Sequence, residues 1–86
     1  MNQITLAQVK EKIVEQIADN YFLSYHHQQL GNDDVSKNML KHSIGLAEFG
    51  RDQFGFETKE LHNLAIEIYH ERKAIMEGKM KNEDTL

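Results

Sequence analysis

Apolar residues recur at helical spacing along three long stretches of this chain, and short breaks separate the stretches. Residues three and four positions apart share one face of an α-helix, so this spacing predicts helices. The predicted helices cover about residues 5–30, 34–54 and 58–77. The breaks are Gly31-Asn32-Asp33 and Gly55-Phe56-Glu57. Glycine supplies the left-handed residue that commonly ends a helix, and the chain contains no proline to interrupt one.

Polar residues that precede each stretch are suited to cap the predicted helices. Thr5 lies three residues before Gln8, the spacing of a capping box in which each side chain satisfies the other's backbone amide. Candidate caps for the next two helices are Asp33 or Asp34 and then Thr58. Because Gly78 interrupts the last pattern, we expect the third helix to stop there and residues 79–86 to form a frayed polar tail.

Connections of about three residues make consecutive helices neighbours that run antiparallel. The sequence therefore predicts an all-α fold, a short-looped antiparallel three-helix bundle with up-down-up topology, as one domain over residues 1–78. No repeat or linker divides the chain. At 86 residues, such a domain has a core that supplies only about 3–5 kcal/mol unless something else adds to it.

The first two helices carry more apolar and small-residue surface than a three-helix bundle needs. Apolar positions of the first helix cover an arc of about 220°, whereas a surface helix usually has a stripe somewhat wider than about 100°. That helix must therefore lie between the other two or present part of its face to another subunit. Small residues along the second helix would let another backbone approach closely. We predict a homodimer whose interaction surface includes Ala18, Phe22, Tyr25, Ser43, Ala47 and Gly50.

The formal net charge of −4 is spread almost evenly along the chain. Residues 1–30 and 31–55 each carry −1, and residues 56–86 carry −2, with histidine counted as neutral. Proteins that bind nucleic acids concentrate Lys and Arg on one face, where these residues neutralise phosphates. No third of this chain is basic, so we expect neither nucleic acid nor an anionic membrane surface as a partner.

Cysteine is absent, which removes disulfides, thiolate metal sites and thiol nucleophiles from consideration. A chain of this size without disulfides is typical of a reducing compartment, so the cytoplasm is the expected location. The first residues lack a basic segment followed by an apolar run, and no stretch approaches the roughly 20 apolar residues that cross a bilayer. We therefore expect a soluble protein that is not exported.

Five histidines are the main compositional oddity. His26 and His27 fall in the last turn of the first helix, where an imidazolium interacts favourably with the helix dipole. His62 lies at the margin of an apolar stripe and is expected to satisfy one polar partner. Arg72 interrupts the apolar face of the third helix, which indicates a guanidinium that reaches over the bundle end or pairs with an acid across it.

One pair of residues matches part of a metal-binding pattern. Glu67-x-x-His70 has the spacing found in carboxylate bundles that hold two metal ions, but those bundles need two such pairs and further glutamates. A homodimer would supply the second pair by symmetry, with Glu11, Glu15 or Glu48 as further ligands. Helical phase places both residues on the polar side of the third helix, where a solvated face is the simpler interpretation.

Catalytic motifs are missing from the sequence. There is no nucleophile elbow and no Gly-rich phosphate loop, and none of the three serines has a local context that would activate it. A bundle this small also leaves no room for a deep pocket unless subunits combine. We therefore predict no catalytic residues and no cofactor. The expected function is that of a non-catalytic helical protein, a regulator, inhibitor or adaptor, that binds itself and another protein.

Overall fold

Three helices form the part of the chain that the structure describes. The computed structural model describes the backbone of residues 3–84 and the side chains of residues 3–78. Helix α1 spans Leu6–Gln29, α2 spans Asp33–Phe54 and α3 spans Thr58–Asp84, and residues 3–84 contain no strand. The predicted all-α class with three helices is confirmed.

Local signals place most of the helix ends as the sequence predicts. At the start of α1, the amide of Gln8 donates to the Thr5 hydroxyl at 3.2 Å, and the Thr5 amide donates to Oε1 of Gln8 at 2.9 Å. Gly55 ends α2 in the left-handed conformation, with φ of 74°. Because that conformation costs glycine little, the chain reverses there without strain.

Three predicted signals at helix ends act differently in the structure. Thr58, the candidate cap of the third helix, is instead the first residue of α3. The residue before α2 is Asn32, whose side chain makes no capping hydrogen bond, and Asp33 and Asp34 lie inside the first turn. There their carboxylates face the positive end of the helix dipole instead of capping it. Gly78 does not end α3, which continues to Asp84. Gly78 keeps a negative φ, and a glycine inside a helix costs only about 1 kcal/mol. Fraying of residues 79–86 stays a prediction.

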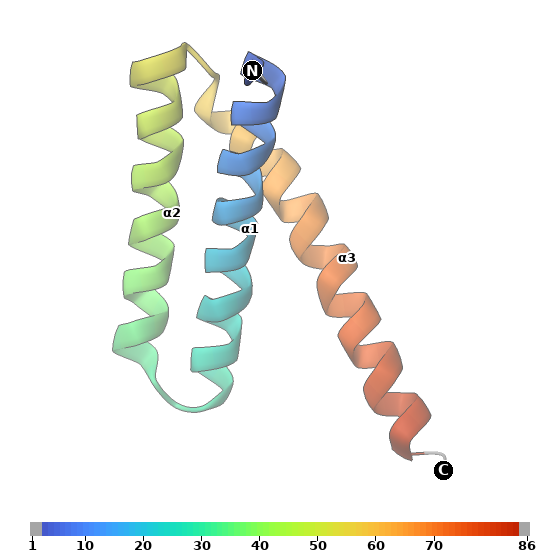
Figure 1. The fold of residues 1–86 in the computed structure, drawn as a ribbon. Coiled ribbons are helices and arrows are strands. Elements are labelled where there is room, and N and C mark those ends of the chain that lie inside the picture. Colours follow the sequence, from blue (N-terminus) through green and yellow to red (C-terminus); the bar gives the residue numbers. More distant parts are fainter. Residues whose placement is uncertain (1–2, 85–86) are drawn as a thin grey trace.

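Helix α1 lies between the other two helices (Figure 1). Helix α2 runs antiparallel beside it and forms a helical hairpin, whereas α3 starts beside the first half of α1 and then diverges from the hairpin (Figure 1). Helices α2 and α3 share few contacts. The radius of gyration is 15.2 Å, compared with about 12 Å for a compact domain of this length. The arrangement is therefore open on the side where α2 and α3 separate.

A small core forms where the three helices come closest. Its buried apolar residues are Ile13, Val14, Ile17, Ala18, Ala47, Leu61 and Ala65. A Cβ atom at Gly50 would lie 3.1 Å from Cδ1 of Leu61 and 3.4 Å from Cδ1 of Ile13. The missing side chain of Gly50 therefore lets α3 and α1 of the same chain approach α2 closely.

Candidate interaction surfaces

Four of the six residues predicted to form an interaction surface lie inside the single chain. They are Ala18, Ser43, Ala47 and Gly50. The small residues of α2 face α1 and α3 of the same molecule, so the close backbone approach that they allow is intramolecular. The other two residues, Phe22 and Tyr25, are half-buried. Helical spacing indicates that a face is packed, but it does not indicate whether the neighbour belongs to the same chain.

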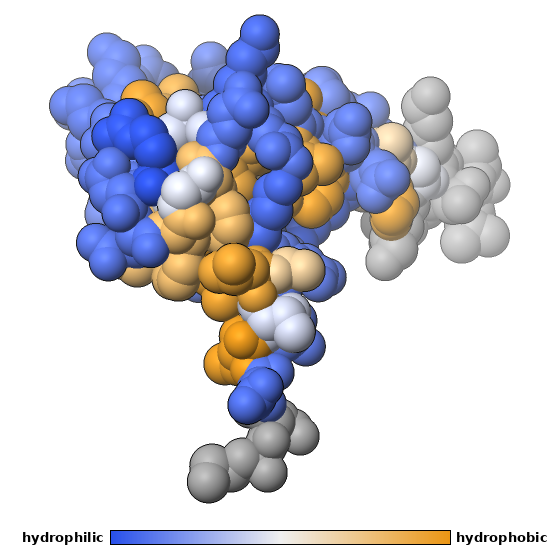
Figure 2. Space-filling model, turned by 90° about the horizontal axis from the view of Figure 1, so that it is seen from above, coloured by the Kyte–Doolittle hydropathy of each residue, from blue (hydrophilic) through white to orange (hydrophobic). Residues whose placement is uncertain are grey.

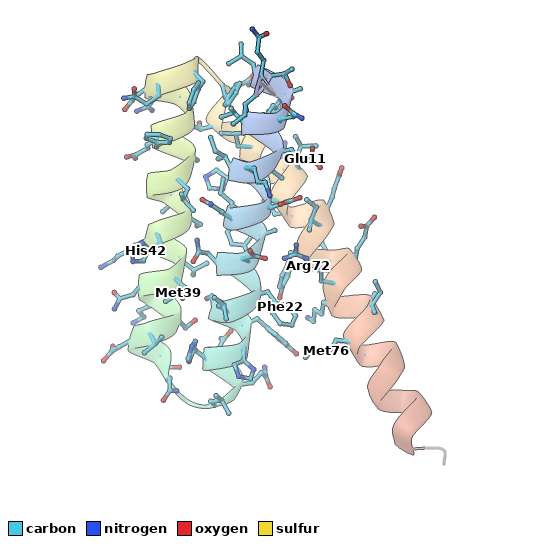
Figure 3. The ribbon with its side chains drawn as sticks, in the orientation of Figure 1. Glu11, Phe22, Met39, His42, Arg72 and Met76 are labelled. Atoms are coloured by element: carbon cyan, nitrogen blue, oxygen red, sulfur yellow. The ribbon has the colours of Figure 1, made fainter. Side chains whose placement is uncertain are left out.

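Phe22 and Tyr25 lie on the side of α1 that faces α3. Phe22 and Arg72 project into the space between these helices (Figure 3). The ring of Tyr25 packs edge to face against Tyr69, with 6.4 Å between centroids, and Nζ of Lys73 lies 4.6 Å from the Tyr25 centroid. Aromatic and cation–π contacts of this kind are worth about 0.5–1.5 kcal/mol each. They hold the middle of α3 against the second half of α1.

A polar contact joins α1 and α3 next to these aromatic residues. The hydroxyl of Tyr21 and Nδ1 of His62 are hydrogen-bonded, and their rings stack. His62 thus finds the polar partner that was predicted for a histidine at the margin of an apolar stripe. Burial raises the pKa of Tyr21 above its usual value, and a hydrogen bond with Ser43 partly offsets that rise.

Ion pairs link the exposed edges of α1 and α3. Nη1 of Arg72 pairs with Oδ1 of Asp19, and Nζ of Lys10 pairs with Oε1 of Glu60. The first pair confirms that Arg72 meets an acid across the helices, one of the two arrangements predicted for it. All four side chains remain partly exposed. Pairs of this kind usually contribute less than about 1 kcal/mol to stability. They therefore influence the orientation of α3 more than the strength of its packing.

Large apolar side chains remain exposed over much of the surface. Among residues 3–78, thirteen of them are exposed, compared with seven buried apolar residues in the core. The accessible surface is 6539 Å², about 1300 Å² more than the roughly 5200 Å² expected of a compact monomer of 10 kDa. Contiguous exposed apolar patches are typical of interaction sites, so these side chains are candidates for one.

One concentration of exposed apolar residues lies where α1 begins and α2 ends. We call it the hairpin groove. Its apolar lining comprises Ile4, Val9, Ile13, Phe49 and Phe54, and its volume is about 860 Å³. Ile4 is 76% exposed and Phe49 is 51% exposed. Figure 2 shows hydrophobic side chains gathered at this end of the molecule. The rim carries charges of both signs, including the pair of Lys12 and Glu15.

A second depression lies where α3 diverges from α2. We call it the α2–α3 trough. Its floor comes from the second half of α1 and its walls from α2 and α3, and its volume is about 430 Å³. The lining residues are Tyr21, Ser24, Tyr25, Gln28, Leu40, Ile66, Tyr69 and His70. No carboxylate is among them, so the trough differs in charge from the mixed rim of the hairpin groove.

Glu67 and His70 lie on different sides of α3. Glu67 lines a depression between α1 and α3, whereas His70 lines the α2–α3 trough, and both side chains are exposed. The side chains described in this chain contain no group of three or more His, Asp or Glu placed to hold a metal ion. Among the side chains of residues 3–78, this pair therefore has no further ligands in place.

Comparison with models of protein families, with curated proteins and with solved structures finds no match. Within the described residues, no helix has the length and apolar character that crossing a membrane requires.

Proposed function

We propose that this chain is a small non-catalytic interaction protein that forms a homodimer through α1 and α2. The observation that carries the proposal is the exposed apolar surface, which includes more large side chains than the core buries. Water disfavours such a surface by about 25 cal/mol for each Å². Association with a second copy would remove part of it from water. We infer a regulator, inhibitor or adaptor of the cytoplasm, in which each copy keeps its helices in up-down-up order.

The hairpin groove is the surface that we assign to the dimer. A two-fold dimer uses the same patch on both subunits, so the patch must complement itself. The groove meets that requirement because Phe49 and Ile4 supply apolar surface while Lys12 and Glu15 supply opposite charges at its rim. Two hairpins packed in this way would place four helices together, an arrangement that buries apolar faces efficiently.

The excess surface of the whole chain is of the order that a stable dimer buries. A standard interface buries about 800 Å² on each partner. This chain exposes about 1300 Å² beyond the area expected of a compact monomer of its mass. The proposed interface uses α1 and α2, as the sequence predicts, but Ile4, Phe49 and Phe54 replace the buried small residues at its centre.

Sedimentation equilibrium over a range of concentrations tests the dimer. We expect a two-fold assembly at about 100 μM, and Phe49→Glu should weaken association at least about tenfold because it buries a charge in the groove. Ile44→Glu is the matched control, since Ile44 is 52% exposed on the same helix, outside the groove lining. A monodisperse 10 kDa species at that concentration, or equal losses for the two variants, would overturn the proposal.

A further inference from the structure

The α2–α3 trough has the shape of a binding site for one additional helix. Helix α1 forms its floor, and α2 and α3 diverge on either side of that floor (Figure 1). Helices pack at interaxial distances of about 8–10 Å with side chains of one between those of the other. An amphipathic helix laid on α1 between α2 and α3 would contact Leu40 on one side and Ile66 and Tyr69 on the other.

Basic side chains lie at two edges of the trough. Lys73 lies over the ring of Tyr25, which forms part of the floor, and His70 lines the wall that α3 provides. Lys37 precedes Leu40 by one turn of α2 and so lies on the same side of that helix. The lining contains no carboxylate. Aromatic rings on the floor, aliphatic side chains on the walls and basic residues at the edges complement an apolar stripe flanked by acids.

The same charges disfavour a second copy of the chain in the trough. In a two-fold dimer the trough of one copy would face the trough of the other, so Lys37 and Lys73 of both copies would come together. Like charges brought together at an interface oppose association. The acidic edge of α3, which includes Glu67 and Glu71, would fit the trough only head to tail, and such contacts lead to open assemblies.

We propose that the α2–α3 trough binds an acidic amphipathic helix of another protein. The proposal rests on the assignment of this chain as an interaction protein, but it concerns a different surface from the hairpin groove. The bound helix inserts apolar side chains, spaced three and four residues apart, between Leu40 and Ile66. Its acids lie against Lys37 and Lys73, where attraction to the basic edges fixes its register and direction.

Two synthetic peptides of about 18 residues test this assignment. Both carry the same helical leucine stripe, and the flanking positions are glutamate in one and lysine in the other. Fluorescence anisotropy with the full chain should show the glutamate peptide binding at least about tenfold more tightly than the lysine peptide. Its affinity should fall severalfold between about 50 mM and 300 mM salt. Equal affinities for the two peptides, or no binding at about 1 mM, would overturn the proposal.

Variants then locate the binding surface. Lys73→Glu and Ile66→Ala should each lower the affinity for the glutamate peptide at least about fivefold. The first variant reverses a basic charge at the edge of the trough, and the second removes part of its apolar wall. Lys12→Glu changes the same charge on the rim of the hairpin groove and should leave peptide affinity unchanged. Circular dichroism confirms that each variant remains folded. Equal effects of Lys73→Glu and Lys12→Glu would contradict the assignment.

Sedimentation of the same variants separates this proposal from the homodimer. Lys73→Glu and Ile66→Ala should leave self-association as it is in the unchanged chain. If either variant abolishes self-association, then a second copy occupies the trough and the proposal fails. If Phe49→Glu abolishes the homodimer while peptide binding persists, the two surfaces act independently, as proposed. A chain that is always monomeric but binds the glutamate peptide would overturn only the homodimer.

Discussion

The two ends of this molecule are packed in different ways. Near the loop between α2 and α3, Gly50 brings Leu61 and Ile13 together, and the three helices form a closed core. Toward the other end, the rings of Tyr25 and Tyr69 stand between α1 and α3, and α3 diverges from α2. Small residues allow close approach, whereas aromatic rings hold helices further apart. The closed end therefore stabilises the fold and carries the hairpin groove on its surface, while the open end forms the α2–α3 trough.

The largest expected effect concerns the closed end. Leu61 is fully buried, so Leu61→Ala should lower the free energy of unfolding by about 2–5 kcal/mol through lost burial and a cavity. Leu64→Ala is the control, because Leu64 is 36% exposed on the same helix and should cost less than about 1.5 kcal/mol. Urea denaturation measures both. Similar losses for the two variants would show that α3 does not pack as described.

An intermediate effect is expected where the closed end gives way to the open end. Tyr21→Phe removes the hydrogen bond to His62 and should cost about 1–2 kcal/mol at pH 7. Because burial raises the pKa of Tyr21, the folded chain holds this proton more tightly than the unfolded chain. The resulting stability is fully present below about pH 10, the usual pKa of tyrosine, and is lost as pH rises through the higher folded pKa.

Urea denaturation between about pH 9 and pH 11 tests the direction of this change in stability with pH. The unchanged chain should lose stability with rising pH more steeply than Tyr21→Phe, because the variant lacks the titrating group. Parallel curves would show that Tyr21 is not buried in the folded chain. Any tyrosine common to both proteins contributes equally to the two curves, so their difference reports Tyr21 alone.

The smallest effect is expected at the exposed edge of the open end. Arg72→Gln and Asp19→Asn each remove one member of a partly exposed ion pair. A double-mutant cycle should give a coupling of about 0.5 kcal/mol, and the coupling should shrink in high salt. A coupling above about 2 kcal/mol would mean that the pair, rather than the aromatic contacts, holds the middle of α3 against α1.

Features that depend on near neighbours in the chain were predictable. The capping box of Thr5 and Gln8 and the left-handed Gly55 are local, so the sequence alone indicates where α1 begins and α2 ends. Gly78 shows the limit of the same reasoning. A glycine ends a helix only where the chain turns into the left-handed conformation, and nothing at Gly78 requires that turn.

The partners of each apolar face were less predictable. Helical phase correctly shows that Ser43 and Ala47 lie on a packed side of α2, but the structure places them inside the chain and leaves Phe49 exposed. Ile4 precedes the first helical stretch and therefore lies outside its periodic apolar pattern. Its only indication in the sequence is a large apolar side chain next to the capping residue Thr5. Helical periodicity gives no information about a residue that precedes the helix.

Local signals in the sequence specify three helices, most of their ends and an excess of apolar surface, because spacing and capping act over a few residues. Tertiary structure alone decided that α1 lies between the other two helices and that α3 diverges from α2 (Figure 1). That geometry depends on the sizes of side chains that meet from distant parts of the chain, such as Gly50 with Leu61 and Tyr25 with Tyr69. Periodicity gives the direction of a side chain along its own helix, whereas only packing between helices selects its neighbour.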